Sequence, residues 1–346
     1  MRMGLLLSGV LLACSTPGPG AGLPDAGDVG EPADAAPAQA PSPPSQLQHW
    51  VTGDPVDAVV TPTGPGLFLA GGGADVDAGF LWMASHAAGG DMVVIRASGS
   101  DGYNDYLYSE LGGFDSVETL LLDRRELADD PYVAWVLAHA EAIFIAGGDQ
   151  WRYIEAWTGT EVQSALADAW SRGAIIGGTS AGCAVLGELA FSAENGTVYS
   201  SEALEDPFNE YMTLERGFFR APPIRGLITD THFGARDRMG RLLGFLARIN
   251  ADGWYREPVG LGIDEATALL VEADGAAEVV GSGSVYAVFA SGSADVCEPG
   301  TALSFTKLSY VELGAGDSIQ LPSGETSAQA ESISVVDGAV SPSDPY

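Results

Sequence analysis

Short apolar runs recur through the middle of the chain, and between them lie segments with the residue pattern of helices. This alternation is typical of βαβ units, in which strands buried on both faces are joined by crossover helices. The predicted strands are 66–70, 91–97, 119–122, 142–146 and 174–178. The predicted helices lie around 78–86, 105–112, 131–139 and 160–172. The sequence therefore predicts an α/β fold with a parallel sheet flanked by helices.

Glycine clusters follow three of these predicted strands, at 71–73, 147–148 and 177–178. Ligands of open parallel sheets bind beyond the carboxyl ends of the strands. We therefore expect a functional site where these glycine-rich turns meet.

The pattern changes from about residue 267, where three short predicted strands, 268–272, 277–280 and 284–290, are separated by turn residues. Such a region either completes the sheet or forms a small β-rich extension. The expected organisation is a signal peptide at 1–13, a disordered tether at 14–48, an α/β domain at 49–295 and a β-rich or irregular extension at 296–346.

Charge excludes one class of partner. The chain has 47 acidic and 15 basic residues, for a formal charge of −32. A surface of this sign repels phosphate backbones, so nucleic-acid binding is not expected.

The N-terminal residues resemble an export signal. Arg2 precedes an apolar run that ends in Leu11-Leu12-Ala13-Cys14 and is too short to span a bilayer. This ending resembles the bacterial lipobox, in which the chain is cut before the cysteine and the thiol is acylated. The expectation is an exported lipoprotein, attached to the outer membrane or cell surface through a lipid on Cys14. An ordinary signal peptide with a chance cysteine is the alternative.

The segment around Ser180 has the pattern of a nucleophile elbow. Gly178-Thr179-Ser180-Ala181-Gly182 lies between a predicted buried strand and a predicted helix. In such elbows glycines two residues from the serine allow a strained turn that exposes the hydroxyl. A serine needs a positioned base, usually histidine, to become a nucleophile.

Only four histidines are available to act as that base. His49 borders the tether, and His86 and His139 lie on predicted helices where packed or solvated histidines are ordinary. His232 instead follows the apolar run 224–228, at the expected carboxyl end of another strand. We therefore expect His232 to be the partner of Ser180.

Four stretches together resemble the cyanophycinase and peptidase E family of serine peptidases, in the family's order. They are Ala146-Gly147-Gly148-Asp149-Gln150, residues 178–182, Thr231-His232-Phe233 through Arg236, Arg238, Gly240 and Arg241, and Gly260-Leu261-Gly262-Ile263-Asp264-Glu265.

The resemblance implies a serine exopeptidase that hydrolyses α- or β-linked aspartyl peptides through an acyl-enzyme. It implies Ser180 as nucleophile, His232 as base, and the N–H groups of Gly148 and Ala181 as an oxyanion hole. It also implies substrate contacts from Gln150, Arg236, Arg238 and Arg241, each arginine having a solvated or ion-paired role as its alternative. Thr231 stands where the cyanophycinase pattern has Gln, so the substrate is left open between cyanophycin and other aspartyl peptides.

The acid that completes the triad is sought among the glutamates between Ser180 and His232. The candidates are Glu188, Glu194, Glu202 and Glu205. The resemblance favours Glu202, which follows the strand-like residues 197–199 and best matches the family's acid before its Asp-Pro turn. Glu194 is the second choice.

Two other functions remain open at this stage, an α/β-hydrolase esterase and a non-catalytic surface binding lipoprotein. The esterase fold shares the elbow and the order Ser, acid, His, but takes its histidine from a late strand. No cofactor and no metal are expected, because no histidines have ligand spacing and Cys183 and Cys297 stand alone. The expected partners are a peptide substrate and the membrane reached through Cys14, with a homodimer left open.

Overall fold

The computed structural model describes residues 40–346, which form one compact unit. The expected signal peptide, the acylated Cys14 and the tether up to residue 39 lie outside the described residues. Within 40–346, no helix combines the length and the apolar character needed to cross a membrane.

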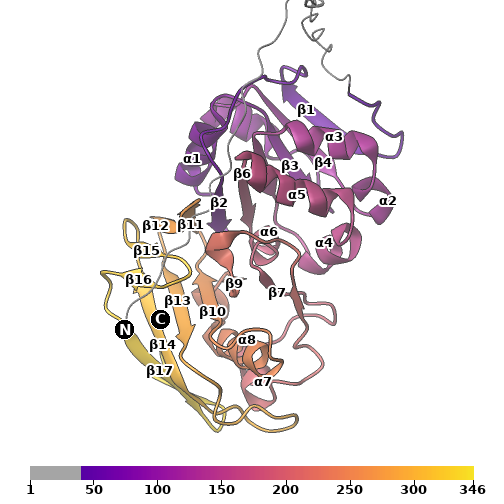
Figure 1. Ribbon diagram of the computed structural model, residues 1–346. Coiled ribbons are helices and arrows are strands. Elements are labelled where there is room, and N and C mark those ends of the chain that lie inside the picture. Colours follow the sequence, from indigo (N-terminus) through magenta and orange to yellow (C-terminus); the bar gives the residue numbers. More distant parts are fainter. Residues whose placement is uncertain (1–39) are drawn as a thin grey trace, which may run out of the picture. The chain divides into compact units, whose positions relative to one another are not determined.

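Ten strands of the described part form the first sheet, in the order β1-β4-β3-β5-β6-β2-β11-β12-β15-β16 (Figure 1). Its centre is parallel, from β4 (Ser116–Leu121) through β3 (Met92–Arg96), β5 (Ala142–Ile145) and β6 (Ile175–Thr179) to β2 (Gly66–Ala70). Antiparallel strands flank this centre: β1 (Gln48–Gly53) on one side, and β11 (Thr267–Glu272), β12 (Ala276–Gly281), β15 (Ser318–Gln320) and β16 (Glu325–Thr326) on the other.

Eight strands in the same residue range form a second sheet, in the order β18-β17-β14-β13-β10-β9-β7-β8. Here β10 (Val259–Ile263) and β7 (Leu189–Phe191) are parallel to β9 (Leu227–Thr231). The remaining pairs are antiparallel and involve β8 (Leu214–Arg216), β13 (Val285–Ala290), β14 (Phe305–Leu313), β17 (Glu331–Val336) and β18 (Ala339–Ser341).

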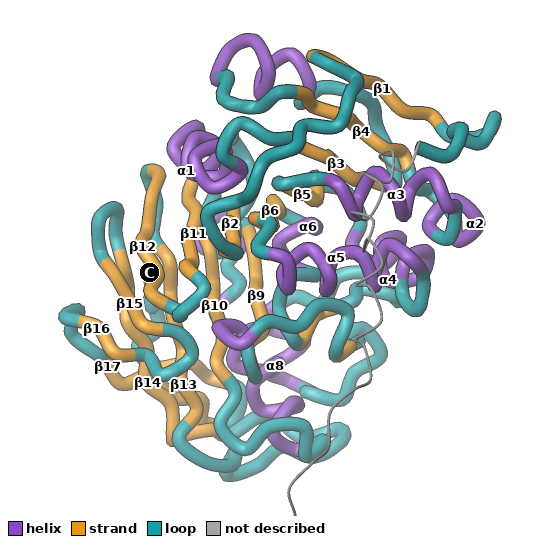
Figure 2. The backbone as a smooth tube through the Cα atoms, turned by 45° about the horizontal axis from the view of Figure 1, so that its top comes forward, coloured by secondary structure: helices purple, strands orange, loops and turns teal. Residues whose placement is uncertain are grey.

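Helices cover both faces of the first sheet. One face packs against α1 (Asp77–Ala87), and the opposite face packs against α2 (Arg125–Ala128), α3 (Pro131–His139), α4 (Gln150–Trp157) and α5 (Glu161–Arg172). Neighbouring residues of a strand point to opposite faces, so Phe68 joins the α1 side while Leu67 and Leu69 join the other. Figure 2 shows α1 and α5 on opposite sides of β2 and β6.

The second sheet has a core of its own with α7 (Ser200–Glu205) and α8 (Met239–Ala251). Its other face shares a core with the first sheet, where Leu261 and Ile263 of β10 cluster with Val271 and Val279. The two sheets therefore bury apolar side chains between them, near the strand ends that carry the predicted site residues.

The expected α/β fold is confirmed, since each of the five predicted parallel strands is present in the first sheet. The region after residue 267 is β-rich, as predicted, and its strands extend both sheets. Residues 296–346 contribute β14 to β18 and belong to the same compact unit as the rest of 40–346.

One local expectation is wrong, and two predicted helical segments are present in a form that the sequence did not specify. Residues 197–199 form no strand but lead directly into α7. The helix after Ser180, α6 (Ala181–Ala184), has a single turn, and the helix expected at 105–112 is a π-helical segment, Tyr106–Leu111. Period and length signals are weak for elements of one or two turns, which tertiary packing decides.

Candidate active site

Ser180 lies directly after β6, on a turn whose backbone is strained. Its φ is +52° and its ψ is −116°, a conformation that residues other than glycine rarely adopt. The turn also needs a glycine two residues later, because a Cβ on Gly182 would lie 2.0 Å from the carbonyl oxygen of Ile145. The structure thus places Ser180 on a nucleophile elbow of the kind predicted from the sequence.

A hydrogen-bonded chain joins Ser180, His232 and Glu265. The Oγ of Ser180 lies 2.8 Å from Nε2 of His232, and Nδ1 of His232 lies 2.6 Å from Oε1 of Glu265. A carboxylate only accepts hydrogen bonds, so Nδ1 carries the imidazole proton and Nε2 is free to accept the proton of Ser180. This is the arrangement that makes a serine nucleophilic.

The backbone of one short segment positions all three loops. The carbonyl of Ala70 accepts the N–H of Ser180 at 3.1 Å, and the carbonyl of Gly71 accepts the N–H of His232 at 2.8 Å. The carbonyl of Gly72 accepts the N–H of Ala266, next to Glu265, at 2.8 Å. Three consecutive carbonyls, beginning with the last residue of β2, therefore hold the three side chains in register, although these follow strands of two different sheets.

Gly72 also explains part of the glycine cluster at 71–73. Its φ is +92°, and a Cβ there would come within 2.6 Å of the His232 imidazole. Any larger residue would displace the ring from Ser180.

The surroundings of His232 favour the neutral imidazole. Burial lowers the pKa of His232, the hydrogen bond to Glu265 raises it, and the charges of Arg236 and Arg238 lower it again. The net direction is below the ordinary value, so the imidazole is neutral and able to act as a base at neutral pH. The same hydrogen bond lowers the pKa of Glu265, whose side chain is 43% exposed.

The expectation that Glu202 reaches His232 is wrong. Glu202 lies in the first turn of α7, where its carboxylate accepts the N–H of Tyr199 at 2.9 Å in a capping box. Both ring nitrogens of His232 are already engaged by Ser180 and Glu265. The second choice, Glu194, lies in an exposed turn, and its backbone N–H donates to Thr213.

A signal for Glu265 was present in the sequence, in the stretch 260–265 that resembles the peptidase family. Glu265 follows β10, and β10 pairs in parallel with β9, with Ile263 opposite Thr231. Carboxyl ends of adjacent parallel strands lie together, so residues just past Ile263 and Thr231 become neighbours. The triad acid was expected among the glutamates between Ser180 and His232, whereas Glu265 follows His232 in the chain.

A cavity of about 80 Å³ opens at Ser180. Gly148 and Ala181, the expected oxyanion-hole residues, both line it, as does Gln150, whose amide lies 3.4 Å from the carbonyl of Phe191. The loop before Gln150 is held by Tyr153, whose hydroxyl bonds to the carbonyls of Ala146 and Gly147. The structure thus brings these three residues to the side chain of Ser180.

The three arginines of the motif all line this cavity but differ in their contacts. Arg241 is 4% exposed and forms a two-pronged ion pair with Asp230, with further hydrogen bonds to Thr197 and Val198. Arg238 donates to the carbonyl of Thr231 and lies 3.4 Å from Asp230. Arg241 is therefore ion-paired, which is one of the alternatives weighed for it.

Arg236 is exposed, and within residues 40–346 its guanidinium has no hydrogen bond or ion pair. The three arginines face one carboxylate, Asp230, so the cavity has an excess of positive charge. They also line an adjoining cavity of about 330 Å³ beside Thr197–Ser200. The site is thus electropositive in a strongly acidic chain.

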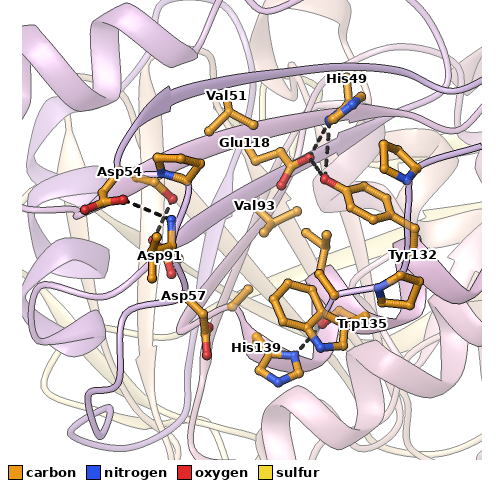
Figure 3. Close-up of a pocket in the computed structure, with 18 of the residues that line it drawn as sticks. His49, Val51, Asp54, Asp57, Asp91, Val93, Glu118, Tyr132, Trp135 and His139 are labelled. Atoms are coloured by element: carbon orange, nitrogen blue, oxygen red, sulfur yellow. Dashed lines mark hydrogen bonds and ion pairs between the residues drawn. The ribbon is translucent and has the colours of Figure 1, made fainter. Parts of the chain in front are cut away.

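A larger cavity, of about 430 Å³, lies elsewhere, between β1, β4 and α3. Figure 3 shows His49 and Tyr132 turned toward Glu118, with His49 Nδ1 2.7 Å from the carboxylate, and His139 stacked on Trp135. None of the predicted site residues lines this cavity. His139 has the packed role expected for it, and His49 is paired with Glu118.

Other chemistry of the described residues is limited. In the part of the chain that the structure covers, no group of three or more His, Cys, Asp or Glu is arranged to hold a metal ion. Cys183 is buried, Cys297 is partly buried, and both thiols are free.

Comparison with known proteins gives three related findings. Residues 96–208, which contain Gly148, Gln150 and Ser180, match the model of peptidase family S51. A cyanophycinase of Synechococcus elongatus is 34% identical over 177 residues, covering 51% of this chain and 50% of that protein. A cyanophycinase of Trichormus variabilis is 31% identical over 183 residues, covering 53% and 56%.

The chain spans about half the length of these relatives. Among solved structures, a peptidase from an acI-B1 actinobacterium superimposes with a TM-score of 0.51 at 18% identity, covering 75% of this chain and 97% of the other. This likeness concerns the fold. The resemblance expected from the four motifs is confirmed: the chain is similar to the cyanophycinase and peptidase E family, and its residues 96–208 match peptidase family S51.

Proposed function

We propose that this protein is a serine exopeptidase that hydrolyses aspartyl peptides, with Ser180 as nucleophile, His232 as base and Glu265 as the acid that orients His232. The observation that carries the proposal is the chain Ser180 Oγ–His232 Nε2–His232 Nδ1–Glu265, with distances of 2.8 and 2.6 Å. Similarity to cyanophycinases supports the substrate class.

The reaction follows from this geometry. His232 Nε2 takes the proton of Ser180 while Oγ attacks the scissile carbonyl carbon, and the N–H groups of Gly148 and Ala181 stabilise the oxyanion. The C–N bond then breaks as His232 returns the proton to the leaving amine. Water, deprotonated by His232, releases the acyl group and restores Ser180.

The charge of the cavity supports an acidic residue next to the bond that is cleaved. Arg236 has a free guanidinium at the cavity wall, and guanidinium groups bind carboxylates in a two-pronged geometry. We assign Arg236 to the carboxylate of the substrate, with Gln150 and Arg238 as further contacts.

The order of the triad distinguishes this proposal from an esterase of the α/β-hydrolase type. In that fold the acid precedes the histidine, whereas Glu265 follows His232 by 33 residues. The strained backbone at Ser180 also argues against a non-catalytic binding protein, because such a protein does not need a serine in this conformation.

The test uses the protein without residues 1–39 and dipeptides that begin with α-linked Asp, with β-linked Asp or with Asn, together with cyanophycin. We expect release of the second residue from an aspartyl substrate, and a clear preference for Asp over Asn. Ser180→Ala should lower turnover by at least about 10³-fold. Equal turnover by the wild type and Ser180→Ala would refute the role of Ser180, and no cleavage of any aspartyl substrate would refute the substrate class.

The localisation rests on residues 11–14 alone. We propose that the chain is exported and held at the outer membrane or cell surface by acylation of Cys14. A peptidase anchored in this way would meet extracellular peptides.

A further inference from the structure

The segment 233–239 connects His232 to α8 and carries two of the three arginines of the site. Its backbone is irregular: a 3₁₀ turn, Gly234–Arg236, is followed by Asp237 with φ +49°, and His232 itself has φ +50°. Residues other than glycine keep such conformations only where the surrounding structure enforces them. The contacts that hold this segment therefore decide where His232 and Arg236 lie.

The hydroxyl of Tyr346 holds one end of the segment. It accepts the N–H of Met239 at 2.7 Å and donates to the carboxylate of Asp237 at 3.1 Å. Met239 is the first residue of α8, and Arg238 at the N-cap makes no side-chain capping bond. The tyrosine hydroxyl thus satisfies one of the N–H groups that a helix start leaves unpaired.

The ring of Tyr346 holds the other end. It lies edge-on to Phe233, with centroids 5.9 Å apart, and edge-on to Tyr286 at 5.7 Å. Phe233 is fully buried and follows His232 directly. Tyr346 therefore contacts both ends of the segment, although 107 residues separate it from Met239.

We propose that Tyr346 is a positioning residue for the site: its ring and hydroxyl fix the segment 233–239 and so hold His232 against Ser180 and hold Arg236 at the cavity. This inference rests on the proposed function for its meaning in catalysis. Tyr346 itself does not line the cavity at Ser180.

The position of the segment is expected to affect the charge state of His232. The charged groups that act on this imidazole are Glu265 from the loop after β10, and Arg236 and Arg238 from the segment itself. A looser segment admits water to the ring and lets the two arginines move away from it, and both changes raise the pKa of His232 while the hydrogen bond to Glu265 is kept. The acid limb of the pH profile therefore reports the position of the segment 233–239. A general loss of stability would lower activity without shifting that limb.

The variants separate the two contacts. Tyr346→Phe removes both hydrogen bonds and keeps the ring, whereas Tyr346→Ala removes both contacts. Tyr310→Phe is the control: Tyr310 is a buried tyrosine of β14 whose hydroxyl bonds Glu331 at 3.3 Å, whereas Tyr346 is 37% exposed and follows β18, and neither residue lines the cavity.

Two assays keep this inference apart from the proposed function. The first is hydrolysis of an aspartyl dipeptide as a function of pH. The second is the rate at which a fluorophosphonate modifies Ser180, which needs the Ser180–His232 pair but no peptide substrate. If the wild type cleaves no aspartyl peptide, the proposed substrate fails, and the modification rate still tests Tyr346.

We expect Tyr346→Phe to lower the modification rate and kcat by about tenfold, within the roughly hundredfold cost of displacing reacting groups by about 1 Å. The acid limb of both pH profiles should move to higher pH, further for Tyr346→Ala, and Tyr310→Phe should match the wild type. A Tyr346→Phe protein with an unchanged rate and an unchanged acid limb would overturn the proposal. So would a loss that Tyr310→Phe reproduces.

Discussion

Replacing Glu265 by Gln tests the central geometric claim of the site. The substitution keeps the shape of the side chain and removes its charge. In the wild type the carboxylate lies 2.6 Å from Nδ1 of His232, so it fixes the tautomer that leaves Nε2 free for Ser180 and stabilises the imidazolium formed during attack. Both effects are greatest in the transition state, and the loss should therefore appear in kcat more than in KM.

The size of the loss follows from the exposure of the group. Removal of the charge of a buried triad acid costs roughly 10⁴-fold in kcat. Glu265 is 43% exposed, so water screens its charge and can replace part of its interaction with the imidazolium. The amide oxygen of Gln can also still accept the Nδ1–H. We therefore expect a decrease of about 10²-fold, at the low end of what triad acids contribute.

The direction of the pH effect gives a second measurement. Glu265 raises the pKa of His232, so its neutralisation lowers that pKa further. Neutral His232 is the active base, and activity rises as pH increases through its pKa. The acid limb of kcat/KM should therefore move to lower pH in Glu265→Gln, although the plateau falls.

Glu202→Gln is the matched control, because Glu202 caps α7 through Tyr199 and does not contact His232. Steady-state kinetics on the best aspartyl dipeptide should give a nearly unchanged kcat for this variant. If Glu265→Gln kept the wild-type kcat and Glu202→Gln lost most of it, Glu265 would be refuted as the triad acid and Glu202 would take its place.

Three further predictions concern charge and anchoring. Arg236→Gln removes a charge that lowers the pKa of His232, so the acid limb of kcat/KM should move to higher pH and KM for aspartyl substrates should rise; an unchanged profile and KM would contradict both roles. Asp230→Asn leaves the buried Arg241 without its counter-charge, and this should lower the free energy of unfolding by about 3 kcal/mol in urea denaturation. A loss below about 1 kcal/mol would show that the ion pair is not needed for stability. Cys14→Ala should release the protein from membrane fractions of the producing cell, and continued attachment would refute acylation at Cys14.

The sequence by itself determined the elements with strong local signals. The buried parallel strands are continuous apolar runs, and the pattern around Ser180 needs glycine because Gly182 packs against the backbone of β5. His232 could be selected because it was the one histidine expected at a strand end. These signals are local, since each follows from the burial or the backbone geometry of a few consecutive residues.

The tertiary structure alone decided which carboxylate meets His232. Many acidic residues were available, and chain order pointed to Glu202, but the pairing of β9 with β10 brings Glu265 to the imidazole. The structure also decided that β9 and β10 belong to a different sheet from β6, and that the carbonyls of Ala70, Gly71 and Gly72 join the sheets at the site. Contacts between residues far apart in the chain depend on strand order and sheet packing, which a periodic pattern of apolar residues does not encode.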